Sequence, residues 1–299
     1  MFVSFMPFLL LCMHFTDRYF ESKRRWPLVL CAFLMIMCNY FFAVTALFAV
    51  AAYGLVKVMD EHKKLSQSIR RYIPFILLLF VSVLMACVLI LPTAYCLLFG
   101  RDKGNVELSI TSFLPNMRLD WLTYYSYSMG LTGFGVYAMF YSFFHAKGSK
   151  RFIAVLTLLF AVCPLLVFIL NGTLYFDAKV LFAFLPLALT VVAWFADDVH
   201  KNGAHKMLLP LPVFIIGSGL ALLVSGPVIS MLLYLVDAAL TAGIILILRK
   251  KHGMYIFSLF LIIAFAGCCA KNAHDMLVPV SDYEKMNNKA VYELAEKAA

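Results

Sequence analysis

The stretch Asn171–Pro186 reads NGTLYFDAKVLFAFLP and separates two long apolar runs, Phe152–Leu170 and Val180–Ala196. Each run is close to the roughly 20 residues that a helix needs to cross the hydrocarbon core of a bilayer. The polar side chains between them are Asn171, Thr173, Asp177 and Lys179. This pattern predicts two membrane spans that meet at one face of the bilayer, with a small polar cluster where they join.

Composition extends this prediction to the whole chain. Hydrophobic residues make up 64% of the 299 residues, charged residues 14%, and the mean hydropathy is +0.90. These values lie well outside ordinary soluble usage. The apolar runs are continuous, which favours helices over the alternating segments of a transmembrane barrel. We predict an all-α polytopic membrane protein with about nine to ten hydrophobic helices.

The distribution of Lys and Arg predicts the orientation, because cytoplasmic loops carry an excess of both. Seventeen of the 25 Lys and Arg lie in segments predicted to be cytoplasmic, namely 16–27, 57–72, 145–151, 196–206 and 249–252. The other eight lie in segments predicted to be outside, namely 100–128, 171–179, 225–227 and 271–299. The net charge of +9 therefore indicates topology and contact with anionic lipid headgroups, and no nucleic-acid partner is expected.

The apolar run Leu28–Met59 is flanked by basic segments on both sides. As one helix it would extend about 48 Å, too long for an upright span. Two cytoplasmic flanks require an even number of crossings. We therefore predict a short broken hairpin that turns around Cys38-Asn39-Tyr40, with Asn39 acting as a helix breaker.

The remaining spans follow by alternation. Ile73–Phe99 is predicted as one span that Pro92 kinks or ends, and Met1–Phe15 as a short or tilted helix. The other predicted crossings are Met129–Phe144, Met207–Ser225, Val228–Leu248 and Met254–Ala270. Residues 1–270 then form a membrane domain, and 271–299 begin an extracytoplasmic C-terminal segment.

Motifs for cofactor chemistry are missing from the sequence. It contains no Walker loop, dinucleotide fingerprint, zinc-ligand spacing or HExxH, so no metal and no cofactor is expected. The eight cysteines lie in or beside apolar runs without a CxxC pair. They are predicted to be small buried thiols.

Asp237 is an acid well inside a predicted span, MLLYLVDAALTAG. An intramembrane carboxylate is a candidate ion site, proton relay or neighbour of a lipid phosphate. The structural alternative is an acid that bonds to Thr, Ser or backbone groups within the bundle, since the small residues that follow it suit close helix packing.

The predicted outer segment 100–128 offers further candidates. Glu107 and Asp120 could act as a general base at the membrane surface or be solvated acids. Trp121 with Tyr124, Tyr125 and Tyr127 is predicted to be an interfacial aromatic belt, with a sugar-stacking platform as the alternative. Lys179 could meet a lipid-linked phosphate or extend to the interface beside Asp177.

Three stretches resemble the YfhO family of bacterial membrane proteins. They read MCNYFFAVTALFAVAAYGL, then VLILPTAYCLLFGR, which ends at Arg101, and LNGTLYFDAKVLFAFLPLAL. The resemblance spans nearly the whole chain. It implies part of a glycosyltransferase-C membrane domain that uses polyprenyl-phosphate sugars at the outer face of the bacterial cell membrane, in glycosylation of envelope polymers such as teichoic acids.

Members of that family are longer than this chain. The acid expected to be catalytic in that fold lies in the first outer loop, ahead of the matched region, so the chain is expected to be a central fragment and the catalytic residue is unassigned. The resemblance suggests Arg101, Arg118 and Lys179 for the lipid phosphate. It suggests Asn171, Tyr175 and Asp120 for the sugar pocket.

Two other functional classes stay open. A transporter or lipid flippase would centre on Asp237 and on the broken hairpin at Asn39. An inactive remnant or assembly subunit is the third hypothesis.

Overall fold

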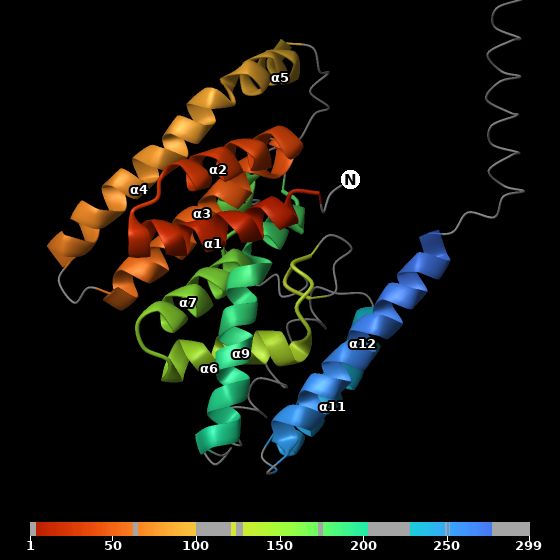
Figure 1. The fold of residues 1–299 in the computed structure, drawn as a ribbon. Coiled ribbons are helices and arrows are strands. Elements are labelled where there is room, and N and C mark those ends of the chain that lie inside the picture. The colour runs from red at the N-terminus through yellow and green to blue at the C-terminus, as the bar shows by residue number, and fades with distance from the viewer. Residues whose placement is uncertain are drawn as a thin grey trace, which may run out of the picture. The chain divides into compact units, whose positions relative to one another are not determined.

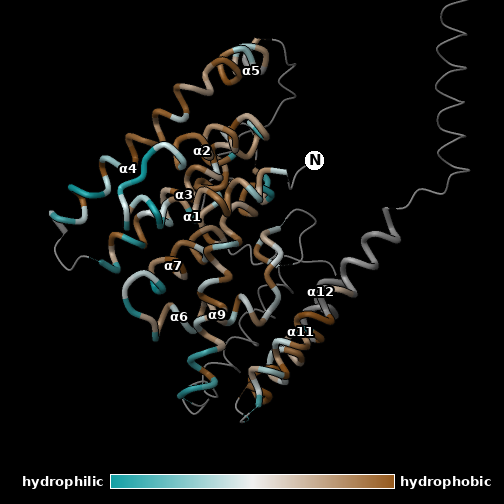
Figure 2. The backbone as a smooth tube through the Cα atoms, in the orientation of Figure 1, coloured by the Kyte–Doolittle hydropathy of each residue, from teal (hydrophilic) through white to brown (hydrophobic). Residues whose placement is uncertain are grey.

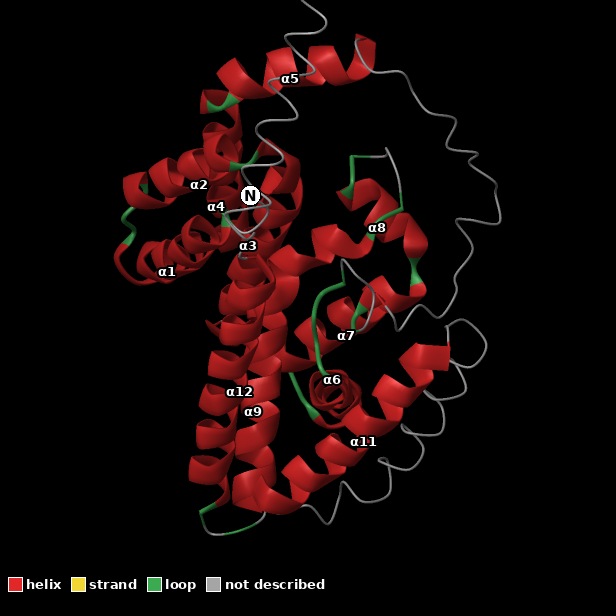
Figure 3. Ribbon diagram, turned by 90° about the vertical axis from the view of Figure 1, so that its right-hand side faces the viewer, coloured by secondary structure: helices red, strands yellow, loops and turns green. Residues whose placement is uncertain are grey.

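The computed structural model describes residues 4–61, 65–99, 121–123, 128–172, 176–202, 228–248, 250 and 252–276. Within these residues the regular structure is entirely helical, as Figure 3 shows. The chain divides into two compact units, residues 1–245 and 246–299. The candidate sites described below all lie in the first unit.

Figure 1 shows the described helices along the chain. They are α1 (Met6–Ser22), α2 (Trp26–Cys38), α3 (Tyr40–Glu61), α4 (Leu65–Met85), α5 (Cys87–Phe99), α6 (Gly133–His145), α7 (Ser149–Val162), α8 (Pro164–Leu170), the 3-10 helix η3 (Ala178–Phe184), α9 (Leu185–Asn202), α11 (Val228–Leu248) and α12 (Gly253–Met276).

Three of the described helices are long and apolar enough to cross a membrane. They are Tyr40–Glu61, Ser66–Met85 and Ala178–Asn202, the last formed by η3 and α9 together. The α4 span exposes large apolar side chains such as Leu77, Phe80 and Leu84, a surface that suits lipid and not water. The all-helical membrane class is thus supported, while the number of nine to ten helices stays a prediction.

The helices of the first unit pack in two groups. In the first, α1, α2 and α3 lie against one another and α4 covers α2 and α3. The buried Ser82 hydroxyl of α4 donates to the Val29 carbonyl of α2 at 3.0 Å. In the second group, α6 packs on α7 and α9, and the Tyr141 hydroxyl of α6 donates to Asp198 of α9 at 3.0 Å.

The predicted break at Asn39 is confirmed. Asn39 is extended, with φ −155° and ψ 91°, and it separates α2 from α3. Its side-chain oxygen accepts the Phe42 amide at 3.3 Å, which satisfies one of the free N–H groups that begin α3. Asn39 therefore acts as a local breaker and cap.

The prediction of one span over Ile73–Phe99 is wrong. The helix breaks at Ala86, between α4 and α5, and Pro92 lies inside α5. The Ser82 hydroxyl bonds back to the Leu78 carbonyl at 3.2 Å, one turn before the break. Such back-bonding competes with the helix ladder and favours a bend, which explains a break upstream of the proline.

The run Phe152–Leu170 is also not one straight helix. Helices α7 and α8 meet at Cys163-Pro164 and are bent by 96° (Figure 3). Pro164 has no N–H, and its ring disfavours helical geometry at Cys163, which is extended with φ −116° and ψ 89°. The two helices together form a broken span or a re-entrant loop.

Two further boundaries differ from the sequence pattern. Helix α6 has 13 residues, about 20 Å, and does not begin until Gly133 because Thr132 caps it. Helix α12 continues to Met276, so the first residues of the predicted C-terminal segment are helical. Its extracytoplasmic location stays a prediction, and Met207–Ser225 lies outside the described residues.

We predict that Gly54→Leu loosens the packing of α3 on α4. A Cβ at Gly54 would collide with the Phe75 ring, and Phe75 cannot retreat because it is fully buried against the rings of Phe20 and Tyr72. Overpacking of this kind costs about 1–3 kcal/mol. The free energy of unfolding in mixed micelles measures the loss. Gly243→Leu is the control, because no atom of the described residues lies within 4 Å of a Cβ there.

Candidate functional site

Helix α3 separates two polar clusters of the first unit. At its C-terminal end, Lys57 Nζ lies 2.9 Å from Asp17 Oδ1, and the Tyr53 hydroxyl donates to the same carboxylate at 2.9 Å. These contacts fasten α1 to α3. Nearby, Arg71 of α4 pairs with Glu61. All these charges lie in or beside segments predicted to be cytoplasmic.

The second cluster lies at the opposite end of α3. Lys179 Nζ lies 4.8 Å from the centre of the Phe41 ring, and Phe41 precedes Lys57 by 16 residues on the same helix. That separation corresponds to about 24 Å along the axis. The turn Asn171–Lys179 and the basic segments therefore lie far apart across the bundle. In Figure 2 the hydrophilic α1–α2 connection and the start of α4 lie together at the left.

The Asn171 side chain fixes the shape of this turn. Its Nδ2 donates to the Val167 carbonyl at 3.0 Å and to the Asp177 carbonyl at 2.8 Å. The first bond adds a second donor to a carbonyl in the last turn of α8 that also accepts the Asn171 backbone N–H at 3.0 Å, and the second bond holds the residue that caps η3. Because both partners are acceptors, the amide must present its nitrogen to them.

The side-chain oxygen of Asn171 has no hydrogen-bond partner among the described residues. Asn171 is 5% exposed, and its Oδ1 is buried without a hydrogen bond to any described residue. A buried polar atom of this kind costs free energy, and such atoms are few in native proteins. Because protein atoms cover this oxygen, it is not open to a ligand in this conformation. The role of Asn171 is therefore to position the turn.

Asp177 and Lys179 form the charged part of the turn. Asp177 Oδ1 accepts the Lys179 amide at 3.1 Å and so caps η3. Asp177 Oδ2 lies 3.4 Å from Lys179 Nζ. The Lys179 side chain is 23% exposed. The cation is therefore reachable from outside while held by a carboxylate and an aromatic ring.

An apolar groove adjoins this turn. It has a volume of about 670 Å³ and lies between α3, α4, α7, α8 and η3. We call it the lateral groove. Its wall includes Ala51 and Ala52 of α3, and it runs from Tyr72 and Phe152 to Leu170 and Phe184. Leu170 directly precedes Asn171, so one end of the groove meets the polar turn.

Asp237 has a structural partner. Its Oδ2 accepts the backbone N–H of Gly133, the first residue of α6, and a Cβ at Gly133 would lie 2.8 Å from that oxygen. The N-terminus of a helix carries partial positive charge, which stabilises a carboxylate there. This contact is of the kind that the structural alternative for Asp237 describes, an acid that accepts a bond from a backbone group within the bundle.

Several predicted site residues lie outside the described residues: Arg101, Arg118, Asp120 and Tyr175. Of the aromatic cluster, only Trp121 is described. It is 4% exposed, and its carbonyl accepts the Met129 amide at 3.0 Å. Trp121 therefore packs inside the protein, so the prediction that it belongs to an interfacial belt is wrong.

The cysteines are more varied than predicted. Cys12 and Cys31 are buried, but Cys38 and Cys96 are exposed on the helical surface. Among the residues that the structure describes, no group of His, Cys, Asp and Glu could hold a metal ion.

Comparison with known proteins yields no matching family model, no curated relative and no solved structure of similar fold. The resemblance to the YfhO family therefore stays a prediction from the sequence.

Two features of the site were not predicted from the sequence. The contact of Lys179 with Phe41 joins the turn to the apex of the α2–α3 hairpin, and nothing in either stretch indicates that pairing. The lateral groove depends on the sharp bend at Pro164. A Cys-Pro pair in the middle of a predicted span is a visible signal for that bend.

We predict that Asn171→Ala destabilises the protein by about 1–3 kcal/mol, because two carbonyls lose their shared donor. Asn171→Asp should cost more, since a carboxylate would face both carbonyl oxygens. Chemical unfolding in micelles measures both changes. The control is Asn202→Ala, whose exposed amide bonds to Asp198 and should matter little. Equal effects at the two positions would contradict the role given to Asn171.

We predict that Asp237→Ala lowers stability by about 1 kcal/mol through loss of the bond at the start of α6. Asp237→Asn keeps an acceptor oxygen and should cost less. The melting temperature in detergent measures the difference. Asp197→Ala, which breaks an exposed ion pair with Lys201, is the control and should change little. If Asp237→Ala leaves the melting temperature unchanged, the capping role is wrong.

Proposed function

We propose that this protein binds a polyprenyl-phosphate-linked sugar within the membrane and belongs to the glycosyltransferase-C type of membrane proteins that glycosylate envelope polymers. The observation that carries the proposal is the lateral groove, an apolar channel of about 670 Å³ that meets a polar turn at one end. A polyprenyl phosphate has the same division, a long branched hydrocarbon ending in an anionic group.

The apolar wall alone gives little selectivity. Lipid chains are as apolar as the groove, so the hydrophobic effect does not favour one lipid over another there. Shape and the polar end must provide the discrimination. Ala51 and Ala52 have small side chains on the α3 wall of the groove, which leaves room for the methyl branches of an isoprenoid chain.

The polar end offers a cation for the phosphate. Lys179 Nζ is partly exposed and lies 3.4 Å from Asp177. A phosphate would compete with that carboxylate for the ammonium group, and charge-assisted bonds of this kind are the stronger ones. Under this proposal Arg101 and Arg118 add further phosphate contacts. Asp120 and Tyr175 border the sugar, and Asn171, whose side chain is buried, holds the turn beside it.

In the transfer reaction of such proteins, a carboxylate takes the proton of the acceptor hydroxyl as that oxygen forms a bond to the sugar. The bond between the sugar and the lipid phosphate breaks, and cations stabilise the departing phosphate. Lys179 is the described residue with the charge and exposure for the second role. The finer details of the predicted fold, nine to ten helices with a glycosyltransferase-C arrangement, belong to the same proposal.

Binding of a photoactivatable polyprenyl phosphate in nanodiscs tests the proposal. Lys179→Ala should lower crosslinking about tenfold or more, because it removes a charged hydrogen bond to the phosphate. Ala52→Trp should lower it as well by filling the groove. Lys201→Ala, a lysine near the far end of the same span, is the matched control.

Mapped crosslinks should fall on α3, α4 and α7. Crosslinking that is unchanged in both Lys179→Ala and Ala52→Trp would contradict the proposal. In a transfer assay, loss of activity in Asp237→Asn with full activity in Lys179→Ala would instead favour a transporter or flippase.

A further inference from the structure

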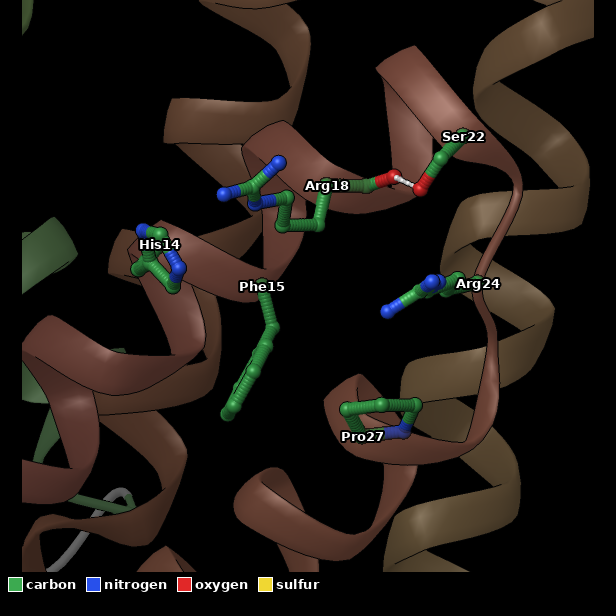
Figure 4. A pocket seen from close by; sticks show the side chains of 6 residues that line it. All are labelled: His14, Phe15, Arg18, Ser22, Arg24 and Pro27. Atoms are coloured by element: carbon green, nitrogen blue, oxygen red, sulfur yellow. Dashed lines mark hydrogen bonds between the residues drawn. The ribbon is translucent and has the colours of Figure 1, made fainter.

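A second cavity lies at the connection between α1 and α2. It has a volume of about 350 Å³ and is lined by His14, Phe15, Arg18, Ser22, Arg24 and Pro27 (Figure 4). We call it the basic pocket. It lies within the segment predicted to be cytoplasmic and has no part in the proposed function.

The spacing of residues along α1 builds one wall of the basic pocket. His14, Arg18 and Ser22 follow at intervals of four and so share one face of the helix. The Ser22 hydroxyl donates to the Arg18 carbonyl at 2.7 Å, which leaves the guanidinium and imidazole groups as side-chain donors. Figure 4 shows the Arg24 guanidinium reaching from the connection into the space between Arg18 and Pro27.

The charge of the basic pocket is poorly compensated. Arg18 Nη1 lies 4.0 Å from Glu21 Oε2, at the outer limit of an ion pair. Within the part of the chain that the structure describes, no acidic side chain pairs with Arg24. Pro27, at the start of α2, also borders the pocket and has no N–H to donate, so the two guanidinium groups are the donors that attract an anion. These features favour a phosphate group.

An apolar groove begins where the basic pocket ends. It has a volume of about 490 Å³ and shares Phe15 and Pro27 with the pocket. We call it the α1–α2 groove. Leu11 on α1 and Leu30 and Leu34 on α2 line it. The pocket and the groove together form a site with a cationic end and an apolar end.

Trp26 marks the level of the membrane surface at this site. Its side chain is 74% exposed and borders the α1–α2 groove. Tryptophan is enriched at membrane–water interfaces, where an apolar ring meets the headgroups. Arginines beside an interfacial tryptophan lie at the depth of lipid phosphates, so the ligand that fits both ends comes from the membrane.

We propose that the basic pocket and the α1–α2 groove bind one anionic phospholipid of the cytoplasmic leaflet. Arg18 and Arg24 hold the headgroup phosphate, and His14 borders the headgroup. An acyl chain runs along the groove past Leu30 and Leu34. An anionic lipid is favoured over a zwitterionic one because Glu21 lies only at the outer limit of an ion pair with Arg18, and no acidic side chain among the described residues pairs with Arg24.

The test uses the whole protein in phosphatidylcholine nanodiscs that contain a small fraction of a photoactivatable phosphatidylglycerol. The wild type should crosslink on α1 and α2, and added salt should weaken labelling. Arg18→Ala with Arg24→Ala should lower labelling roughly tenfold. Leu34→Trp should lower it by filling the groove, and Lys147→Ala with Lys201→Ala is the control for removing two exposed cations.

Three outcomes would overturn the proposal. The first is equal labelling by a phosphatidylcholine probe, which would remove the preference for an anionic lipid. The second is an equal loss in the arginine pair and the lysine control, which would indicate a general surface effect. The third is complete displacement by inorganic phosphate, which would indicate a site for small anions. A matched melting temperature for each variant shows that the fold is retained.

Discussion

The bond from the Asn171 side chain to two carbonyls holds together the part of the molecule on which the candidate site depends. One acceptor, Val167, lies in the last turn of α8, and the other, Asp177, caps η3 at the start of the next span. Without that bridge the Asp177 carbonyl would lose the donor that ties it to the end of α8, whereas the Val167 carbonyl would keep the Asn171 backbone N–H. Every unsatisfied backbone group in hydrocarbon costs several kcal/mol, so one amide decides where the chain can turn.

The same constraint explains the other interruptions of the helices. At Asn39 the side chain caps the helix that follows. At Ala86 the backbone continues through Ala86-to-Ser82 and Ile90-to-Ala86 bonds, although the helix axis changes. At Cys163 the proline that follows needs no acceptor, because it has no N–H. Each break has a local means of satisfying its polar groups, so a bundle of short helices can remain within a bilayer.

Each end of α3 makes a contact with a charged side chain. One end holds the Asp17–Lys57 contact and the other the Lys179–Phe41 contact. An apolar groove reaches the Asn171–Lys179 turn, and a second groove reaches the arginines of the α1–α2 connection. This arrangement places cationic side chains near an apolar groove toward each end of α3, and it is the observation on which both proposals of lipid binding rest.

Much of this could be predicted from the sequence, but not all of it. Hydropathy predicted the spans at α3 and α9, and the doubled length of Leu28–Met59 predicted the break at Asn39. The break at Ala86 was not predicted because an apolar run does not reveal it, whereas the Cys163-Pro164 pair was a signal for the second bend that went unused. Trp121 was misplaced because an aromatic near a span end can face inward. Contacts between distant residues, such as Asp237 with Gly133, depend on packing that periodicity does not encode.

The claim that the Asn171–Lys179 turn and the basic loops lie on opposite sides of the membrane is tested most directly by labelling one position on each side. Gly172 is exposed and has open space around it, and Lys147 is exposed beside α7. Gly172→Cys should react with a membrane-impermeant maleimide on intact cells, above the level of the parent chain. Lys147→Cys should react only after permeabilisation. Reaction of both positions from the same side would contradict the account.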